Sequence, residues 1–245
     1  MTAETFNRYE YKYLINEGTF EKIRDYLLKF MTPDKYNIDG NAYSIANLYY
    51  DTNDDFLIRN SLSKPTYKEK LRLRAYGTPS LSDKVFIEIK KKHKGIVNKR
   101  RTNIVLEDAY FFTENGYPSK VTGIMNRQVT SEITYFLKVY PVFPKLYLAY
   151  DRFAFFGKEN SDIRVSFDTN IRTRRYDLRL EYGDYGEKLL DEELYLMEIK
   201  SENSIPLWLT KMLSDYEIKR RSFSKYGTEF KKYLSSDEMR YIANG

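Results

Sequence analysis

Residues 67–77 read YKEKLRLRAYG, and this stretch decides the fold. Leu71 and Leu73 alternate with charged residues. The basic residues recur at every second position: Lys68, Lys70, Arg72 and Arg74. Because alternate residues of a β-strand point to opposite faces, the pattern predicts a strand with one basic face and one apolar face.

The same alternation recurs elsewhere in the chain, at residues 8–15, 84–92, 146–156, 162–168 and 195–201. The polar faces of these segments are rich in Lys and Arg and include single carboxylates: Glu10, Glu88, Asp168 and Glu198. A solvated face would also mix in Thr, Ser and Gln. The repetition therefore predicts several strands that share a basic face.

Segments with helical spacing separate these strands. Asn16 suits the N-cap of a helix in which Phe20, Ile23 and Leu27 recur, and Pro33 closes it. Further helices are expected at residues 51–62, within 108–140, at 206–213 and after 223. No Pro/Gly/Ser-rich linker or internal repeat divides the chain, so residues 1–245 are predicted to form one α+β domain of mostly antiparallel strands.

Composition excludes several classes of protein. The 245 residues contain no Cys and one His, His93, which rules out disulfide scaffolds, Cys-based metal sites and thiol nucleophiles. The 42% apolar and 16% aromatic residues suffice for a folded core, and the net charge is +6. No apolar run approaches a membrane span, so a soluble, cytoplasmic protein is expected, with any membrane attachment supplied by a partner protein.

Two arrangements account for the basic faces. In the first, each sheet is half exposed, with its apolar side inward and its charged side in water. In the second, the sheet closes on itself with its charges inside and helices outside. Such an interior would need a polyanion and a metal ion to neutralise it, because Arg and Lys bind phosphate while carboxylates bind Mg²⁺ or Mn²⁺. Charge alone does not choose between them.

A set of short motifs favours the second arrangement. In order along the chain they are RYEYKY (8–13), LRLRAYG (71–77), VFIEIKKK (85–92), YDRFAF (150–155), IRVSFDT (163–169), YLMEIKS (195–201) and SFSKYG (222–227). Together they resemble the VTC domain, the polyphosphate polymerase branch of the triphosphate tunnel metalloenzymes. Each motif alone is weakly specific, but the resemblance covers nearly the whole chain.

The resemblance implies a closed antiparallel β-barrel of about eight strands, with a charged tunnel inside. It also implies transfer of the γ-phosphate of ATP to a growing inorganic polyphosphate chain, with Mn²⁺ or Mg²⁺ as cofactor. The residues carried over as catalytic are Lys12, Arg72, Arg74, Lys90, Arg152 and Arg164. Those expected to bind phosphate are Arg8, Lys70, Lys99, Lys200, Ser224 and Lys225. The expected metal ligand is Glu198, with Glu10 and Glu88 as further candidates.

One departure bears on the reaction. The hydrolase and cyclase branch of the superfamily opens with Glu-x-Glu-x-Lys, whereas Arg8 stands first here, which favours the polymerase. Two other functions stay open: hydrolysis of triphosphate or polyphosphate in the same tunnel, and polyanion binding without catalysis. Nucleic acid is not expected as a ligand, because the basic residues are assigned to an interior.

Overall fold

The computed structural model describes residues 9–37, 40–94, 96–120, 125–160, 162–191, 193–202 and 204–244, with side chains of the last helix up to Ser236. Its strands form one antiparallel sheet, and eight of them follow a single path. In spatial order these are β1 (Tyr9–Asn16), β10 (Leu194–Ser201), β8 (Arg164–Arg174), β7 (Val142–Gly157), β3 (Tyr43–Thr52), β4 (Tyr67–Tyr76), β5 (Lys84–His93) and β6 (Ile96–Val105). Two short strands pair beside them: β2 (Met31–Pro33) with β7 and β9 (Glu187–Lys188) with β8.

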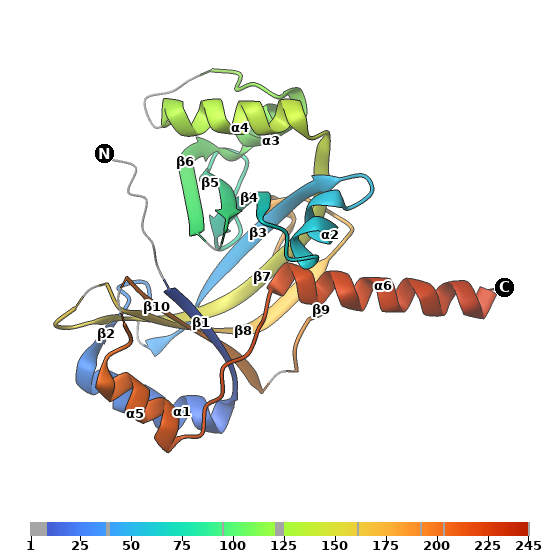
Figure 1. The fold of residues 1–245 in the computed structure, drawn as a ribbon. Helices are drawn as coiled ribbons and strands as arrows, with labels where there is room; N and C mark the ends of the chain where they lie inside the picture. The colour runs from blue at the N-terminus through green and yellow to red at the C-terminus, as the bar shows by residue number, and fades with distance from the viewer. Residues whose placement is uncertain are drawn as a thin grey trace.

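Helices cover the sheet in three places (Figure 1). They are α1 (Glu17–Phe30), α2 (Phe56–Leu62), α3 (Leu106–Asn115), α4 (Arg127–Val139), α5 (Leu207–Asp215) and α6 (Lys225–Asn244), with a 3₁₀ turn η2 at Leu180–Tyr182. The pair α3 and α4 packs on the outer side of β3–β6, whereas α1 and α5 pack on the outer side of β1, β10 and β8. The start of α6 packs with α2 on the opposite, inner side of β3, β7 and β8.

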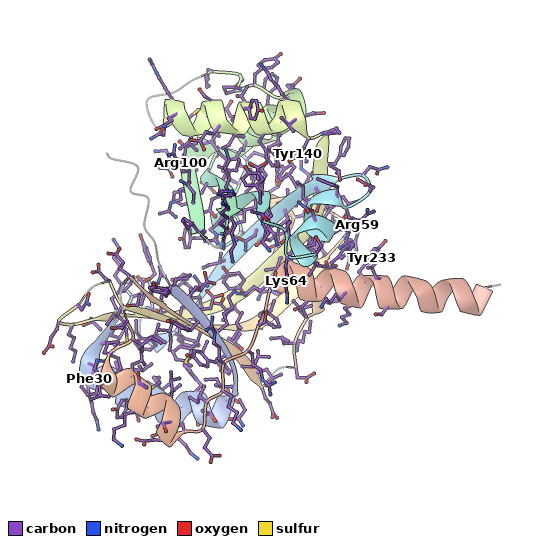
Figure 2. The ribbon with its side chains drawn as sticks, viewed as in Figure 1. Phe30, Arg59, Lys64, Arg100, Tyr140 and Tyr233 are labelled. Carbon is purple, nitrogen blue, oxygen red and sulfur yellow. The ribbon has the colours of Figure 1, made fainter. Side chains whose placement is uncertain are left out.

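Burial of apolar side chains explains this arrangement. Leu71 and Leu73 of β4 are fully buried beneath α3 and α4, as their alternation with basic residues predicts. Phe20 of α1 lies in the second core and stacks on Tyr195 of β10 at 4.6 Å. Figure 2 marks the two helix-covered outer regions with Arg100, beside α4, and Phe30, beside α5.

The closed barrel expected from the resemblance is wrong for the described strands. β1 and β6 are the two ends of the strand order and do not pair with each other. The sheet nevertheless curls, because register shifts opposite Tyr49 and Tyr50 and after Ala149 place an extra residue on β7 and on β8, and such bulges bend the strands. A row of charges, Lys99 to Arg101, lies on the β6 edge, and charged edges resist further strand pairing.

Most of the predicted elements are confirmed, and the differences have local causes. β4 has the predicted bounds, and the Asn16 side chain caps α1 by accepting a hydrogen bond from the Thr19 amide at 2.8 Å. The two strands expected at 162–168 and 171–176 are one strand, β8. Asn170 adopts a left-handed φ of 47° between them, and a register shift that places an extra residue on β8 accommodates it without ending the strand. No helix in the described ranges is long and apolar enough to span a membrane.

Candidate functional site

We call the side of the sheet opposite Leu71 and Leu73 the inner face. Cross-strand register places most of the predicted site residues on it, because residues that are Cα partners in a sheet point the same way. Lys12 pairs with Glu198, Lys200 with Arg164, and Arg152 with Asp168. On strands β4, β5 and β6, Arg72 pairs with Glu88, and Lys90 pairs with both Lys70 and Lys99.

Glu198 is the first of three acidic centres on this face. Its Oε1 lies 3.1 Å from Lys12 Nζ and 3.7 Å from Lys225 Nζ, and its Oε2 lies 3.2 Å from Lys200 Nζ. Burial opposes ionisation, but these three ammonium groups outweigh it and hold the pKa of Glu198 well below its usual range. Glu198 is therefore a carboxylate at all ordinary pH values.

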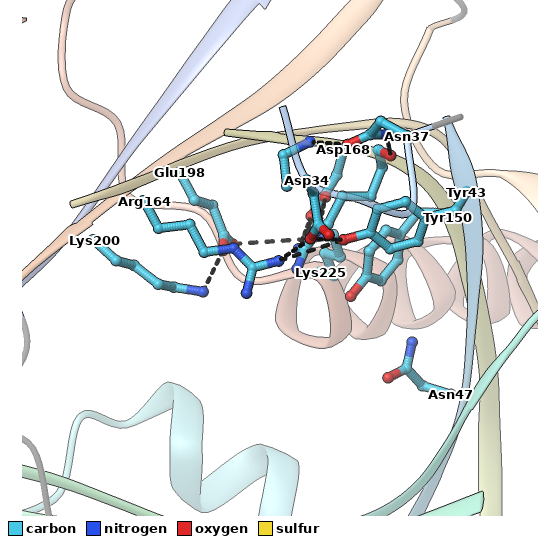
Figure 3. A network of polar contacts seen from close by, with 12 residues as sticks. Asp34, Asn37, Tyr43, Asn47, Tyr150, Arg164, Asp168, Glu198, Lys200 and Lys225 are labelled. Atoms are coloured by element: carbon cyan, nitrogen blue, oxygen red, sulfur yellow. Dashed lines mark hydrogen bonds and ion pairs between the residues drawn. The ribbon is translucent and has the colours of Figure 1, made fainter. Parts of the chain in front are cut away.

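Asp168 is the second acidic centre and is fully buried. Arg152 clamps it with two hydrogen bonds, from Nε to Oδ1 at 2.6 Å and from Nη2 to Oδ2 at 2.8 Å. Lys225, the first residue of α6, also binds Oδ2. Burial opposes ionisation here too, yet Arg152 and Lys225 lower the pKa of Asp168. The pair Asp168 and Lys225 thus fixes the start of α6 against the inner face (Figure 3).

Glu88 is the third centre and is surrounded by cations. Arg72 donates to its Oε2 from Nε at 2.8 Å, and Lys99 Nζ lies 3.0 Å from its Oε1. Tyr49 Oη accepts a second hydrogen bond from Arg72, at 2.8 Å. Burial disfavours the charge of Glu88, but Arg72, Arg74 and Lys99 hold its pKa well below the usual range. The hydrogen bonds to Glu88 and Tyr49 therefore fix the orientation of the Arg72 guanidinium.

Lys70 and Lys90 differ from these residues, because neither makes a salt bridge with any described side chain. Burial lowers the pKa of Lys70 to about 8, and burial also lowers the pKa of Lys90. Lys90 is solvent-exposed, whereas Lys70 is half-buried and its Nζ lies 5.6 Å from the centre of the Tyr226 ring. An anion between these lysines would favour their charged forms and give each a partner of opposite charge.

The remaining predicted residues lie at the ends of the inner face or beyond it. Arg164 begins β8 and contacts Tyr43 and Asp34. The Ser224 hydroxyl accepts a hydrogen bond from the Gly227 amide at 3.2 Å, so it caps α6. Arg8 lies outside the described residues. That any of these side chains contacts a substrate stays a prediction.

Several residues of the inner face were not among the predicted site residues. Asn47 accepts a hydrogen bond from Arg74 Nε at 3.0 Å, and the centre of the Tyr150 ring lies 4.5 Å from Lys225 Nζ. Arginine and lysine charges lower the pKa of Tyr49 and of Tyr150 against the opposing effect of burial. β3 is largely apolar on both faces, so alternation indicated nothing for Asn47 and Tyr49, and Tyr150 of β7 is an aromatic residue that an alternation of charges does not single out.

The carboxylates at the β1–β10 pair fit a divalent cation. Lys12 Nζ lies 3.1 Å from both Glu10 Oε1 and Glu198 Oε1, so two carboxylates converge on one position that now holds a positive charge. No cluster of three or more His, Cys, Asp or Glu residues with metal-binding geometry occurs in the described part of the chain. Mg²⁺ and Mn²⁺ often bind through one or two carboxylates plus substrate phosphates, which matches this incomplete set.

Comparisons with known proteins place the chain in a family. The VTC domain model matches residues 7–234. Vacuolar transporter chaperone complex subunit 4 of Schizosaccharomyces pombe is 23% identical over 269 residues; the match covers 92% of this chain but only 37% of that protein.

Two solved structures share the fold. A candidate adenylate cyclase from Bacillus halodurans superposes with a TM-score of 0.54 at 14% identity, covering 89% of this chain and 95% of that one. A candidate adenylyl cyclase from Hippeastrum, described as having a dominant triphosphatase activity, gives a TM-score of 0.50 at 17% identity and covers 89% and 92%. At these identities the two structures support the fold alone. Because the family model spans most of its length, this chain belongs to the VTC domain family.

Proposed function

We propose that the protein is a polyphosphate polymerase, which transfers the γ-phosphate of ATP to the end of an inorganic polyphosphate chain. The observation that carries the proposal is the surplus of cations on the inner face. Glu88, Asp168 and Glu198 are each paired with basic side chains, whereas Lys70 and Lys90 form no salt bridge with a described side chain. A linear polyanion would supply negative charge to pair with these lysines along the strands.

The transfer needs positioning and charge neutralisation more than acid–base chemistry. A terminal oxygen of the polyphosphate attacks the γ-phosphorus, the bond from that phosphorus to the β,γ-bridging oxygen breaks, and ADP leaves. The attacking oxygen is already anionic, so no general base is required. Arg72 and Arg74, held by Tyr49 and Asn47, are suited to neutralise the transferring group, because their side chains need little reorganisation.

We assign the divalent cation to Glu198 and Glu10. A Mn²⁺ or Mg²⁺ ion bound there would neutralise charge on the substrate phosphates. Lys12 would then turn from these carboxylates toward phosphate. For Glu88 we propose the role of counter-ion, since Arg72, Arg74 and Lys99 surround it.

Residues 1–245 are proposed to form one domain, which the continuity of the single sheet supports. The relative in Schizosaccharomyces pombe is a subunit of a complex. For this chain we propose a cytoplasmic location and a membrane protein as partner.

Product analysis tests the reaction directly. Incubation with ATP and Mn²⁺ is expected to yield ADP and long-chain polyphosphate, resolved by gel electrophoresis and degraded by an exopolyphosphatase. Orthophosphate as the sole phosphorus product, from ATP or from inorganic triphosphate, would identify a hydrolase and overturn the proposal. Binding of triphosphate with no turnover of ATP would identify a non-catalytic polyanion-binding protein.

A further inference from the structure

A pocket opens at one end of the inner face, where β4 ends at Tyr76 and β8 begins at Arg164. Its volume is about 410 Å³, within the range of small-molecule sites. The residues that line it are Asp34, Lys35, Tyr36, Tyr43, Tyr76, Phe156 and Arg164. None of the phosphate-binding roles assigned above accounts for its aromatic side chains.

Three tyrosines form a cluster in this pocket. The ring centroids are 6.0 Å apart for Tyr36 and Tyr43, 6.3 Å for Tyr36 and Tyr76, and 6.1 Å for Tyr43 and Tyr76. Tyr36 is 57% exposed and Tyr76 is 50% exposed, so both keep ring surface open to a ligand. A phosphate chain has no apolar plane to cover these rings, whereas a nucleobase stacks on them.

Arg164 connects the pocket to the basic part of the inner face. Its Nη2 donates to Tyr43 Oη at 3.3 Å and lies 3.6 Å from Asp34 Oδ2, and its guanidinium lies 4.9 Å from the centre of the Phe156 ring. Its Nε is buried and has no hydrogen-bond partner among the described groups. On the neighbouring strand its Cα partner is Lys200, which salt-bridges to Glu198; Figure 3 shows Arg164 and Lys200 extending side by side.

Asp34 gives the pocket a hydrogen-bond acceptor. Its Oδ1 accepts from the Tyr36 amide and its Oδ2 from the Tyr43 hydroxyl, each at 3.3 Å. Burial raises the pKa of Tyr43 to about 12, so this hydroxyl stays a donor. A carboxylate has about four acceptor positions, which leaves Asp34 able to accept from an exocyclic amino group.

We propose that this pocket binds the adenine base of the ATP substrate, stacked on Tyr36 and Tyr76. Asp34 accepts from the adenine amino group, and Arg164 donates to the triphosphate where it leaves the pocket for the inner face. This inference rests on the proposed function, because it takes ATP as the phosphate donor. It adds a base-recognition site to a face that otherwise recognises only phosphate.

Calorimetric titration of ATP and of inorganic triphosphate separates base recognition from phosphate binding. Tyr36→Ala and Tyr76→Ala are each expected to weaken ATP binding about tenfold, the scale of one lost base–aromatic stack. Both variants should bind triphosphate within about twofold of the unaltered protein, because no basic residue is removed. Tyr76→Phe keeps the ring and should keep the ATP affinity. Tyr135→Ala, on the outer helix α4, is the matched control because Tyr135 is 68% exposed and remote from the pocket.

The outcomes distinguish this inference from the function on which it depends. Equal losses of ATP and triphosphate affinity in the two alanine variants, or no loss of either, would overturn the base site and leave the polymerase proposal standing. Selective loss of ATP affinity supports the base site, even if product analysis finds hydrolysis in place of polymerisation. If the unaltered protein binds neither ligand, both proposals fail.

Discussion

Replacement of Glu198 by glutamine is expected to lower the rate of phosphate transfer roughly 100-fold or more, while triphosphate still binds. The amide keeps the shape of the side chain but removes the negative charge that we assign to the divalent cation. Lys12, Lys200 and Lys225 lose an ion-pair partner at the same time, so they become more available to phosphate. Triphosphate affinity without metal should therefore stay equal or increase.

The measurement is the rate of ADP release with Mn²⁺ present, beside calorimetric binding of triphosphate without metal. Glu132→Gln is the matched control, because Glu132 lies on α4 outside the sheet and pairs with Arg100 and Lys91. It should leave both quantities unchanged. A Glu198→Gln variant with the unaltered protein's rate would remove Glu198 from the metal site.

Replacement of Arg152 by alanine is expected to give the largest loss of stability. Asp168 is fully buried, and Arg152 supplies two of its hydrogen bonds, so the variant leaves a buried carboxylate with Lys225 as its remaining cation. Removal of one partner of a buried ion pair costs about 3 kcal/mol in free energy of unfolding. For a chain of this length that corresponds to a fall in melting temperature of roughly 6–12 °C.

A second substitution tests the cause of that loss. In the double variant Arg152→Ala with Asp168→Asn the buried carboxylate is neutral, and Lys225 keeps Glu198 as its acidic partner at 3.7 Å, so the melting temperature should recover part of the loss. Arg100→Ala removes a partly exposed ion pair with Glu132 on the outer side and should cost at most about 1 kcal/mol. If Arg152→Ala and Arg100→Ala lower the melting temperature equally, the Arg152–Asp168 pair does not contribute more to the free energy of unfolding than an outer ion pair, and this prediction is wrong.

The strands with alternating charge were predictable from the sequence, and so was the face on which their charges lie. Arg72 and Arg74 share a face with Glu88 in the structure because a period of two fixes side-chain direction wherever one face is buried. Lys12 and Glu198, almost two hundred residues apart, are Cα partners on β1 and β10. Only the motif order indicated that these strands belong to one sheet.

What could not be predicted depends on contacts between distant elements. β3 carries buried side chains on both faces, because α6 and α2 cover part of the inner side with Tyr226, Phe230 and Ile58. The sequence of β3 therefore has no alternation that distinguishes its two faces, and the contacts of Asn47 and Tyr49 were found only in the structure. Whether β1 meets β6 depends on the curvature of the whole sheet, which no local pattern encodes. The aromatic pocket likewise joins residues 34–43, 76, 156 and 164, which no single motif contains.

The inner face is proposed to bind a linear phosphate chain, and thermal unfolding with added anions tests this claim most directly. At a hundredfold excess over its Kd a ligand stabilises the folded state by about 2.7 kcal/mol, which predicts a rise in melting temperature of roughly 5–10 °C with triphosphate. Orthophosphate at equal concentration should give much less, since it cannot span several strands. Arg72→Ala should shrink the triphosphate effect, and Lys232→Ala, on the exposed side of α6, should not. Equal shifts from orthophosphate and triphosphate, unaffected by Arg72→Ala, would contradict the claim.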